Sequence, residues 1–148
     1  MEDFKSAFMD GLKAARDAEI ARKEIGEVFN NLNIQLAEVS KGKIRIERRI
    51  FEVERPLVAR IALSFEPPET YLAIAAVNPT IKDSQPKELA KWQTDIAGYP
   101  CQISWGSQVE YCEDKQALER CLANLLRDAV VAERLDALMK IKATEKEN

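Results

Sequence analysis

The residues of this chain that could do chemistry are three cysteines, several closely spaced carboxylates and a run of lysines and arginines. Histidine is absent from all 148 residues, although it is the commonest metal ligand and the usual general base near neutral pH. Ser-His and Cys-His triads are therefore excluded. Cys101, Cys112 and Cys121 have neither C-x-x-C spacing nor a fourth partner, so we predict no metal and no cofactor, with the thiols buried as small apolar side chains.

Carboxylate pairs are the remaining route to acid–base catalysis. The candidate pairs are Glu66 with Glu69 and Glu52 with Glu54. Each pair falls in a predicted turn or on the exposed face of a predicted strand, where carboxylates are normally solvated. The five glycines match neither a dinucleotide-binding motif nor a phosphate-binding loop. We therefore predict no catalytic residue and a function other than catalysis.

A basic stretch lies at residues 41–60, which carry seven basic and three acidic side chains in a chain of net charge −3. Lys43, Arg45 and Arg49 share one parity of a predicted strand and would form a basic ridge. Such a ridge could hold nucleic-acid phosphates or an acidic protein, or could simply be a solvated strand face that protects a sheet edge. The three interleaved glutamates and the lack of interleaved aromatic residues weigh against nucleic acid. Modulation of a nucleic acid or of a nucleic-acid enzyme remains an alternative.

The order of patterns predicts one α+β domain: a long N-terminal helix, an antiparallel β-meander of six or seven strands, and a C-terminal helix packed on the sheet. Apolar residues at three- and four-residue steps mark the helices, and alternating apolar residues mark the strands. The expected strands include 34–39 and 57–65. The expected bounds are 3–31 for the first helix, 34–112 for the sheet with a long loop at 78–88, 115–140 for the second helix and 142–148 for a flexible tail.

Four aromatic residues lie towards the end of the predicted sheet: Trp92, Tyr99, Trp105 and Tyr111. Tryptophan and tyrosine line binding sites and interfaces, but these four also occupy the apolar parity of their strands. Packing under the helices explains them without a ligand. A protein interface and a small-ligand pocket beneath Trp92 and Trp105 remain as alternatives.

The N-terminal helix has large apolar residues at its ends and small ones in the middle. Its roughly 43 Å length exceeds the approximately 38 Å diameter of a compact domain of this size. We therefore expect the helix to reach a partner, with the small residues allowing close approach of a second helix. The predicted dimer interface consists of Phe4, Phe8, Gly11, Ala14, Ala15, Ala18, Ile25 and Phe29.

These features predict a small cytoplasmic protein-interaction module, a homodimer that binds, chaperones or inhibits another protein. The start Met-Glu-Asp lacks the basic region of a signal peptide, and the longest apolar run, Tyr71 to Val77, has seven residues against the roughly 20 of a membrane span. No membrane contact is therefore expected. Length, acidity and order of elements resemble those of small bacterial secretion chaperones and immunity proteins, which suggests a bacterial accessory role. No motif is shared, so no residue is carried over.

Overall fold

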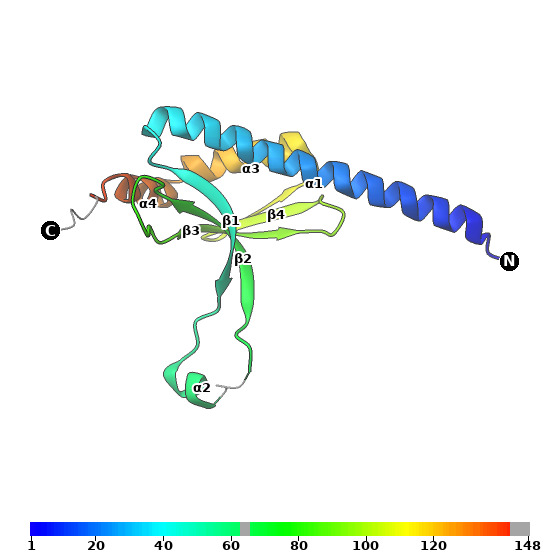
Figure 1. The fold of residues 1–148 in the computed structure, drawn as a ribbon, viewed down its shortest axis with the longest axis horizontal. Coiled ribbons are helices and arrows are strands. Elements are labelled where there is room, and N and C mark those ends of the chain that lie inside the picture. Colours follow the sequence, from blue (N-terminus) through cyan, green and yellow to red (C-terminus); the bar gives the residue numbers. More distant parts are fainter. Residues whose placement is uncertain (63–65, 143–148) are drawn as a thin grey trace.

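The computed structural model describes residues 1–62 and 66–142. The described chain is α+β, with a five-stranded antiparallel sheet in the order β1-β2-β3-β4-β5 and helices packed on one of its faces (Figure 1). The elements are α1 (Phe4–Ser40), β1 (Arg45–Glu52), α2 (Leu57–Ala62), β2 (Thr70–Val77), β3 (Lys87–Thr94), β4 (Cys101–Trp105), β5 (Gln108–Cys112), α3 (Lys115–Arg127) and α4 (Ala129–Met139).

Helix α1 begins where the sequence predicts and ends later. The Asp3 carboxylate caps it by accepting hydrogen bonds from the Lys5 and Ser6 amides. The expected end at residue 31 and the expected strand at 34–39 are wrong, because the helix continues to Ser40 and is closed by Lys41 in the left-handed conformation. Burial explains the difference: Leu32 and Leu36 continue the helical spacing and pack against the core. That contact outweighs the strand preference of the β-branched residues in the segment.

The antiparallel meander is confirmed, with five strands rather than six or seven. Besides 34–39, the expected strand at 57–65 is wrong over residues 57–62, which form the short helix α2, whereas residues 63–65 lie outside the described residues. The β1–β2 pairing runs without interruption from Arg45↔Val77 to Glu52↔Thr70. The expected loop after β2 is present and spans residues 78–86.

The expected C-terminal helix is two helices that meet at Asp128. The Asp128 backbone is extended (φ −66°, ψ 130°), which ends α3. Its carboxylate then accepts hydrogen bonds from the Val130 and Val131 amides at the start of α4. A single Asp therefore ends one helix and caps the next, as aspartate does at many helix starts. Of the expected tail, residues 143–148 lie outside the described part of the chain.

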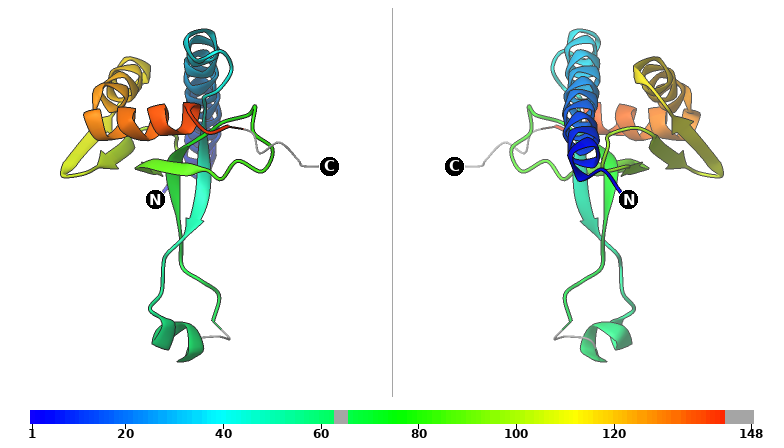
Figure 2. Two further views of the ribbon diagram at one scale, coloured as in Figure 1. Left: turned by 90° about the vertical axis from the view of Figure 1, so that its left-hand side faces the viewer. Right: turned by 90° about the vertical axis from the view of Figure 1, so that its right-hand side faces the viewer.

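The core lies between the sheet and the layer formed by α1, α3 and α4 (Figures 1 and 2). Two parts of the chain project from this body. The N-terminal half of α1 continues past the sheet, and residues 50–62 and 66–72, which we call the hairpin arm, extend from its edge with α2 at the tip. Within the described residues, no helix has the length and apolarity that a bilayer crossing requires.

Candidate interaction surfaces

The apolar stripe of α1 changes role where the helix leaves the body. Ile25 and Phe29 are 2% and 5% exposed and belong to the chain's own core, and Ala18 is also buried. Phe4 and Phe8, on the same stripe, are 80% and 66% exposed. The small residues between them are exposed as well: Gly11, Ala14 and Ala15. The eight residues of the predicted interface therefore do not form one free surface, since three of them are buried in the chain itself.

We call residues 4–15 the helix arm. The body ends near α1 residues 21 and 22, where the turn between β3 and β4 touches the helix. A Cβ placed on Gly98 would lie 2.8 Å from the Cβ of Ala21, and Arg22 Nη1 donates a hydrogen bond to the Ile96 carbonyl at 2.7 Å. The Ile96 side chain is 90% exposed beside this contact, so it adds apolar surface at the inner end of the helix arm.

One glutamate neutralises part of the predicted basic ridge. On the open face of β1, Arg45 Nη2 lies 2.7 Å from Glu47 Oε1 and Arg49 Nε lies 2.6 Å from Glu47 Oε2. Partial burial alone would raise the pKa of Glu47, but the hydrogen bonds from Arg49 and Arg45 outweigh it and lower that pKa. Lys43 is exposed in the segment before the strand. The ridge therefore carries one net positive charge over its two arginines and shared glutamate, a weak field for phosphate binding.

Arg48 has a structural position that the sequence pattern did not single out. Its guanidinium lies 4.6 Å from the centroid of the Phe29 ring and 5.7 Å from that of Trp92. Such contacts stabilise a cation by about 0.5–2 kcal/mol. Burial lowers the pKa of Arg48, but an arginine stays protonated at neutral pH. Arg48 therefore covers the edge of the core beneath α1 and does not add to the basic ridge.

The aromatic group divides between core and surface. Trp92 and Trp105 are buried, whereas Tyr111 is 66% exposed on the open face of the sheet. Tyr99 donates a hydrogen bond to Glu24 Oε1 at 2.9 Å; burial and then this bond raise the pKa of Tyr99. The two tryptophans line separate cavities, an open one of about 620 Å³ beside Trp92 and one of about 240 Å³ beside Trp105. No single cavity beneath both tryptophans is present among the described residues.

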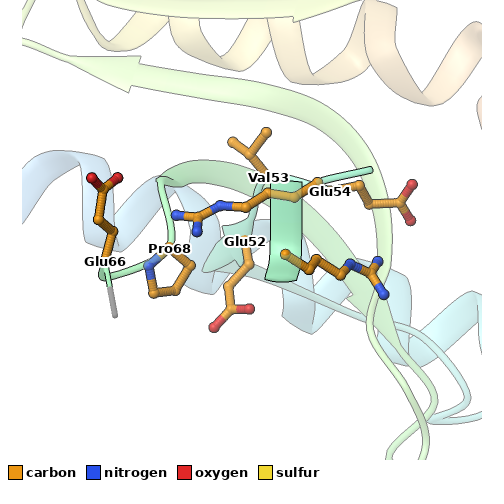
Figure 3. A pocket seen from close by; sticks show the side chains of 7 residues that line it. Glu52, Val53, Glu54, Glu66 and Pro68 are labelled. Atoms are coloured by element: carbon orange, nitrogen blue, oxygen red, sulfur yellow. The ribbon is translucent and has the colours of Figure 1, made fainter. Parts of the chain in front are cut away.

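Three of the four candidate carboxylates, Glu52, Glu54 and Glu66, do not converge (Figure 3). A cavity of about 300 Å³ in the hairpin arm is lined by Glu52, Glu54 and Glu66 together with Pro68 and neighbours. Figure 3 shows the three carboxylates pointing in different directions rather than towards one point. General acid–base chemistry by a carboxylate pair needs both groups on one substrate bond. This geometry does not supply that arrangement.

The thiols are buried and free, as expected from the sequence. Cys112 Sγ and Cys121 Sγ lie 2.8 Å apart between β5 and α3. Burial raises the pKa of Cys101 to about 11 and also raises the pKa values of Cys112 and Cys121. All three therefore stay protonated and unreactive at neutral pH. In residues 1–62 and 66–142 no cluster of three or more acidic or thiol side chains could hold a metal ion.

Two features of the β1 region escaped the sequence interpretation. Asn33 resembles a helix end in the sequence, but its side-chain amide binds the edge of β1: Nδ2 donates to the Ile46 carbonyl at 2.9 Å, and Oδ1 accepts from the Ile46 amide at 2.7 Å. The sequence signal for this contact was Asn33 itself, a polar residue in the middle of an otherwise apolar helical stripe. The second feature is the hairpin arm, whose exposed apolar side chains are Ile50 (69%), Val53 (40%), Leu57 (70%), Val58 (78%), Ile61 (71%) and Leu72 (40%).

Comparison with known proteins gives no match: no family model, no curated protein and no solved structure is significantly similar to this chain.

Proposed function

We propose that this chain is a non-enzymatic protein-interaction module that pairs with a second copy of itself through the helix arm and binds another protein as a dimer. One observation carries the proposal: the stripe that packs α1 onto the body continues past the body, where Phe4 and Phe8 are left 80% and 66% exposed. Large exposed apolar patches on a soluble domain usually mark interaction sites. The three buried free thiols suit the reducing cytoplasm that we propose as its location.

The residue spacing of the helix arm suits an antiparallel helix pair. Positions 4, 8, 11 and 15 follow the four–three–four spacing of a helix–helix seam. If two arms pair antiparallel, Phe8 lies opposite Gly11 of the second copy and Phe4 lies opposite Ala15. Each large ring then fills the space above a small residue, so both helices approach closely. No described atom lies within 4 Å of a Cβ built on Gly11, so its own fold does not require a glycine there.

The strength of such a pair follows from the exposed aromatic area. A phenylalanine buries roughly 150–250 Å² when fully covered, so exposures of 80% and 66% leave about 290 Å² per chain to cover. For two chains this corresponds to about 15 kcal/mol at roughly 25 cal/mol per Å². Association costs about 4–15 kcal/mol in lost freedom. The remainder is between about 0 and 11 kcal/mol, so full burial of the rings predicts a dissociation constant no tighter than about 10 nM.

Sedimentation velocity over a concentration series tests the proposal. The double variant Phe4→Glu/Phe8→Glu should weaken self-association by about a hundredfold or more, because two charges per chain would enter the seam. Ile20→Glu is the matched control, since Ile20 is 63% exposed on the opposite face of the same helix. The seam is refuted if both variants associate like the wild type, or if the control weakens association as much as the double variant.

The alternative functions have less support. Glu47 pairs with both Arg45 and Arg49, which weakens the case for a nucleic-acid modulator. For a small-ligand function, the cavity beside Trp92 is open and is separate from the one beside Trp105. Titration with DNA, RNA and a ligand panel at low salt would revive either alternative if it revealed saturable binding.

A further inference from the structure

At the base of the hairpin arm, residues 50–52 of β1 and 70–72 of β2 form a two-stranded ribbon. Among the described residues, no third strand pairs with this ribbon. β2 pairs with β3 only from Ala73 to Ala76, so Thr70 to Leu72 pair with β1 alone. Figures 1 and 2 show the arm extending away from the sheet and from the helix layer. An isolated two-stranded hairpin is marginally stable in water, whereas three or more strands with an apolar face are stable. The arm therefore gains most from a partner that supplies further strands.

The outer edge of β1 is satisfied at one end and free at the other. Ser40 Oγ accepts a hydrogen bond from the Ile44 amide, and the Asn33 amide binds both backbone groups of Ile46. Backbone groups alternate in direction along a strand, so those of Arg48, Ile50 and Glu52 point outwards as well. Within residues 1–62 and 66–142 no hydrogen bond to these three residues comes from outside β1 and β2. The Asn33 side chain thus occupies the place that a neighbouring peptide group would take, and the next three places are open.

We call the segment from Arg48 to Glu52, whose outward backbone groups are unpaired among the described residues, the window. Its sequence can pair with a second copy of itself. The window is centred on Ile50, with the Asn33-bound Ile46 four residues before it and the end of β1 at Glu52 two residues after it. In an antiparallel pair about this centre, Ile50 lies opposite Ile50 and Arg48 lies opposite Glu52, twice by symmetry. Apolar and opposite-charge cross-strand pairs each stabilise a sheet by roughly 0.2–1 kcal/mol. The second copy therefore offers Ile50 an apolar partner and places Arg48, whose guanidinium packs on Phe29 and Trp92, across from Glu52.

We propose that the β1 edge from Arg48 to Glu52 is a second contact between copies, in which two β1 strands pair antiparallel about Ile50 and join two five-stranded sheets into one. The ribbons of the two copies then form one four-stranded layer in the order β2-β1-β1-β2. The contact is isologous, as closed two-fold interfaces are. It goes beyond the helix-arm pairing proposed above and uses none of the same residues.

Cysteine cross-linking tests the register directly. Residues facing each other in a hydrogen-bonded antiparallel pair have Cα atoms about 5.5 Å apart, within the roughly 4.4–6.8 Å that a disulfide spans. Ile50→Cys should therefore form an intermolecular disulfide with glutathione disulfide as oxidant, each link releasing two reduced glutathiones. The native thiols are buried, and Ile61→Cys on the same arm, 71% exposed, is the matched control. Equal cross-linking of both variants, or none of the Ile50→Cys chain, overturns the proposal.

Sedimentation velocity separates this contact from the helix-arm contact. Ile50→Lys places two like charges opposite each other and should weaken β1 pairing by about tenfold or more; Ile50 is 69% exposed, so folding is unaffected. Because each chain then has two separate two-fold contacts, we expect the wild type to assemble beyond the helix-arm dimer, Ile50→Lys and Phe4→Glu/Phe8→Glu each to stop at a dimer, and the combined variant to be a monomer. If the wild type is a dimer and Ile50→Lys dissociates it, the proposed β1 contact is supported and the proposed helix-arm seam is refuted. An assembly unchanged by Ile50→Lys, including one in which the edge binds another protein's strand instead, overturns the inference.

Discussion

Gly98→Ala should loosen α1 from the body at the point where the helix arm begins. Gly98 has φ +96°, a region that residues with a Cβ rarely adopt. A Cβ at this position would also lie 2.8 Å from Ala21 Cβ and 3.2 Å from the Arg22 amide nitrogen. The substitution therefore adds backbone strain and a collision with the helix. Relief of the collision requires the turn and α1 to separate.

The two effects can be given magnitudes. A non-glycine residue in a sparsely populated backbone region costs about 1–3 kcal/mol, and an extra methyl group in a packed contact costs about 1–3 kcal/mol. We expect the free energy of unfolding to fall by roughly 2–6 kcal/mol. For a chain of this size that corresponds to a fall in Tm of about 6–18 °C.

Urea denaturation followed by tryptophan fluorescence measures this loss, with two matched variants. Gly106→Ala carries the strain alone, because its φ is +56° and no described atom lies within 4 Å of the added Cβ. Ala21→Gly combined with Gly98→Ala removes the 2.8 Å contact, although not the 3.2 Å approach to the Arg22 amide nitrogen, and should recover about 1–3 kcal/mol as coupling energy. If Gly98→Ala destabilises no more than Gly106→Ala, or if Ala21→Gly recovers nothing, then α1 does not lie on this turn.

Two further perturbations probe the β1 edge and the open sheet face. Asn33→Asp should lower the free energy of unfolding by about 1–3 kcal/mol, because the Ile46 carbonyl loses its donor. Urea midpoints measure this loss, and Asn30→Asp, exposed on the same helix, is the control. Equal midpoints for the two variants would refute the role of Asn33. Glu47 has a lowered pKa, so its stabilisation is present above its unfolded pKa of about 4.3 and is lost as pH falls through the folded value. Glu47→Gln should therefore be less stable than the wild type at neutral pH and converge with it once the pH falls below the lowered folded pKa of Glu47, whereas a difference independent of pH would contradict the ion pairs.

Long periodic segments of the sequence were informative, and short ones were not. The stripe from Phe4 to Phe29 predicts α1 because its apolar residues keep the helical spacing over about seven turns, which a strand period of two does not fit. Residues 57–62 contain too few positions to separate a period of two from one of 3.6, so α2 was interpreted as a strand. The helix break was missed because Asp128 interrupts no apolar periodicity; only its backbone angles and the two amides that it caps reveal it.

The surfaces were predictable to a smaller degree than the fold. The eight-residue interface was drawn from periodicity, which identifies a face but cannot tell where along a helix the chain's own sheet ends. Ile25 and Phe29 therefore appeared equivalent to Phe4 and Phe8, although the turn at Gly98 divides them. The β1 edge depends on a hydrogen bond between Asn33 and Ile46, thirteen residues apart. Such pairings arise from tertiary structure and leave no local pattern in the sequence.

Amide hydrogen exchange over residues 4–15 at low and high protein concentration tests the helix-arm pairing most directly. In a single chain these residues are exposed except for half-buried Leu12, and Gly11 lowers their helix stability by about 1 kcal/mol. Their amides should therefore exchange quickly in dilute solution and become at least about tenfold better protected when a second copy covers them. Protection that is the same at both concentrations, while residues 25–36 stay protected throughout, would contradict a pairing of two helix arms.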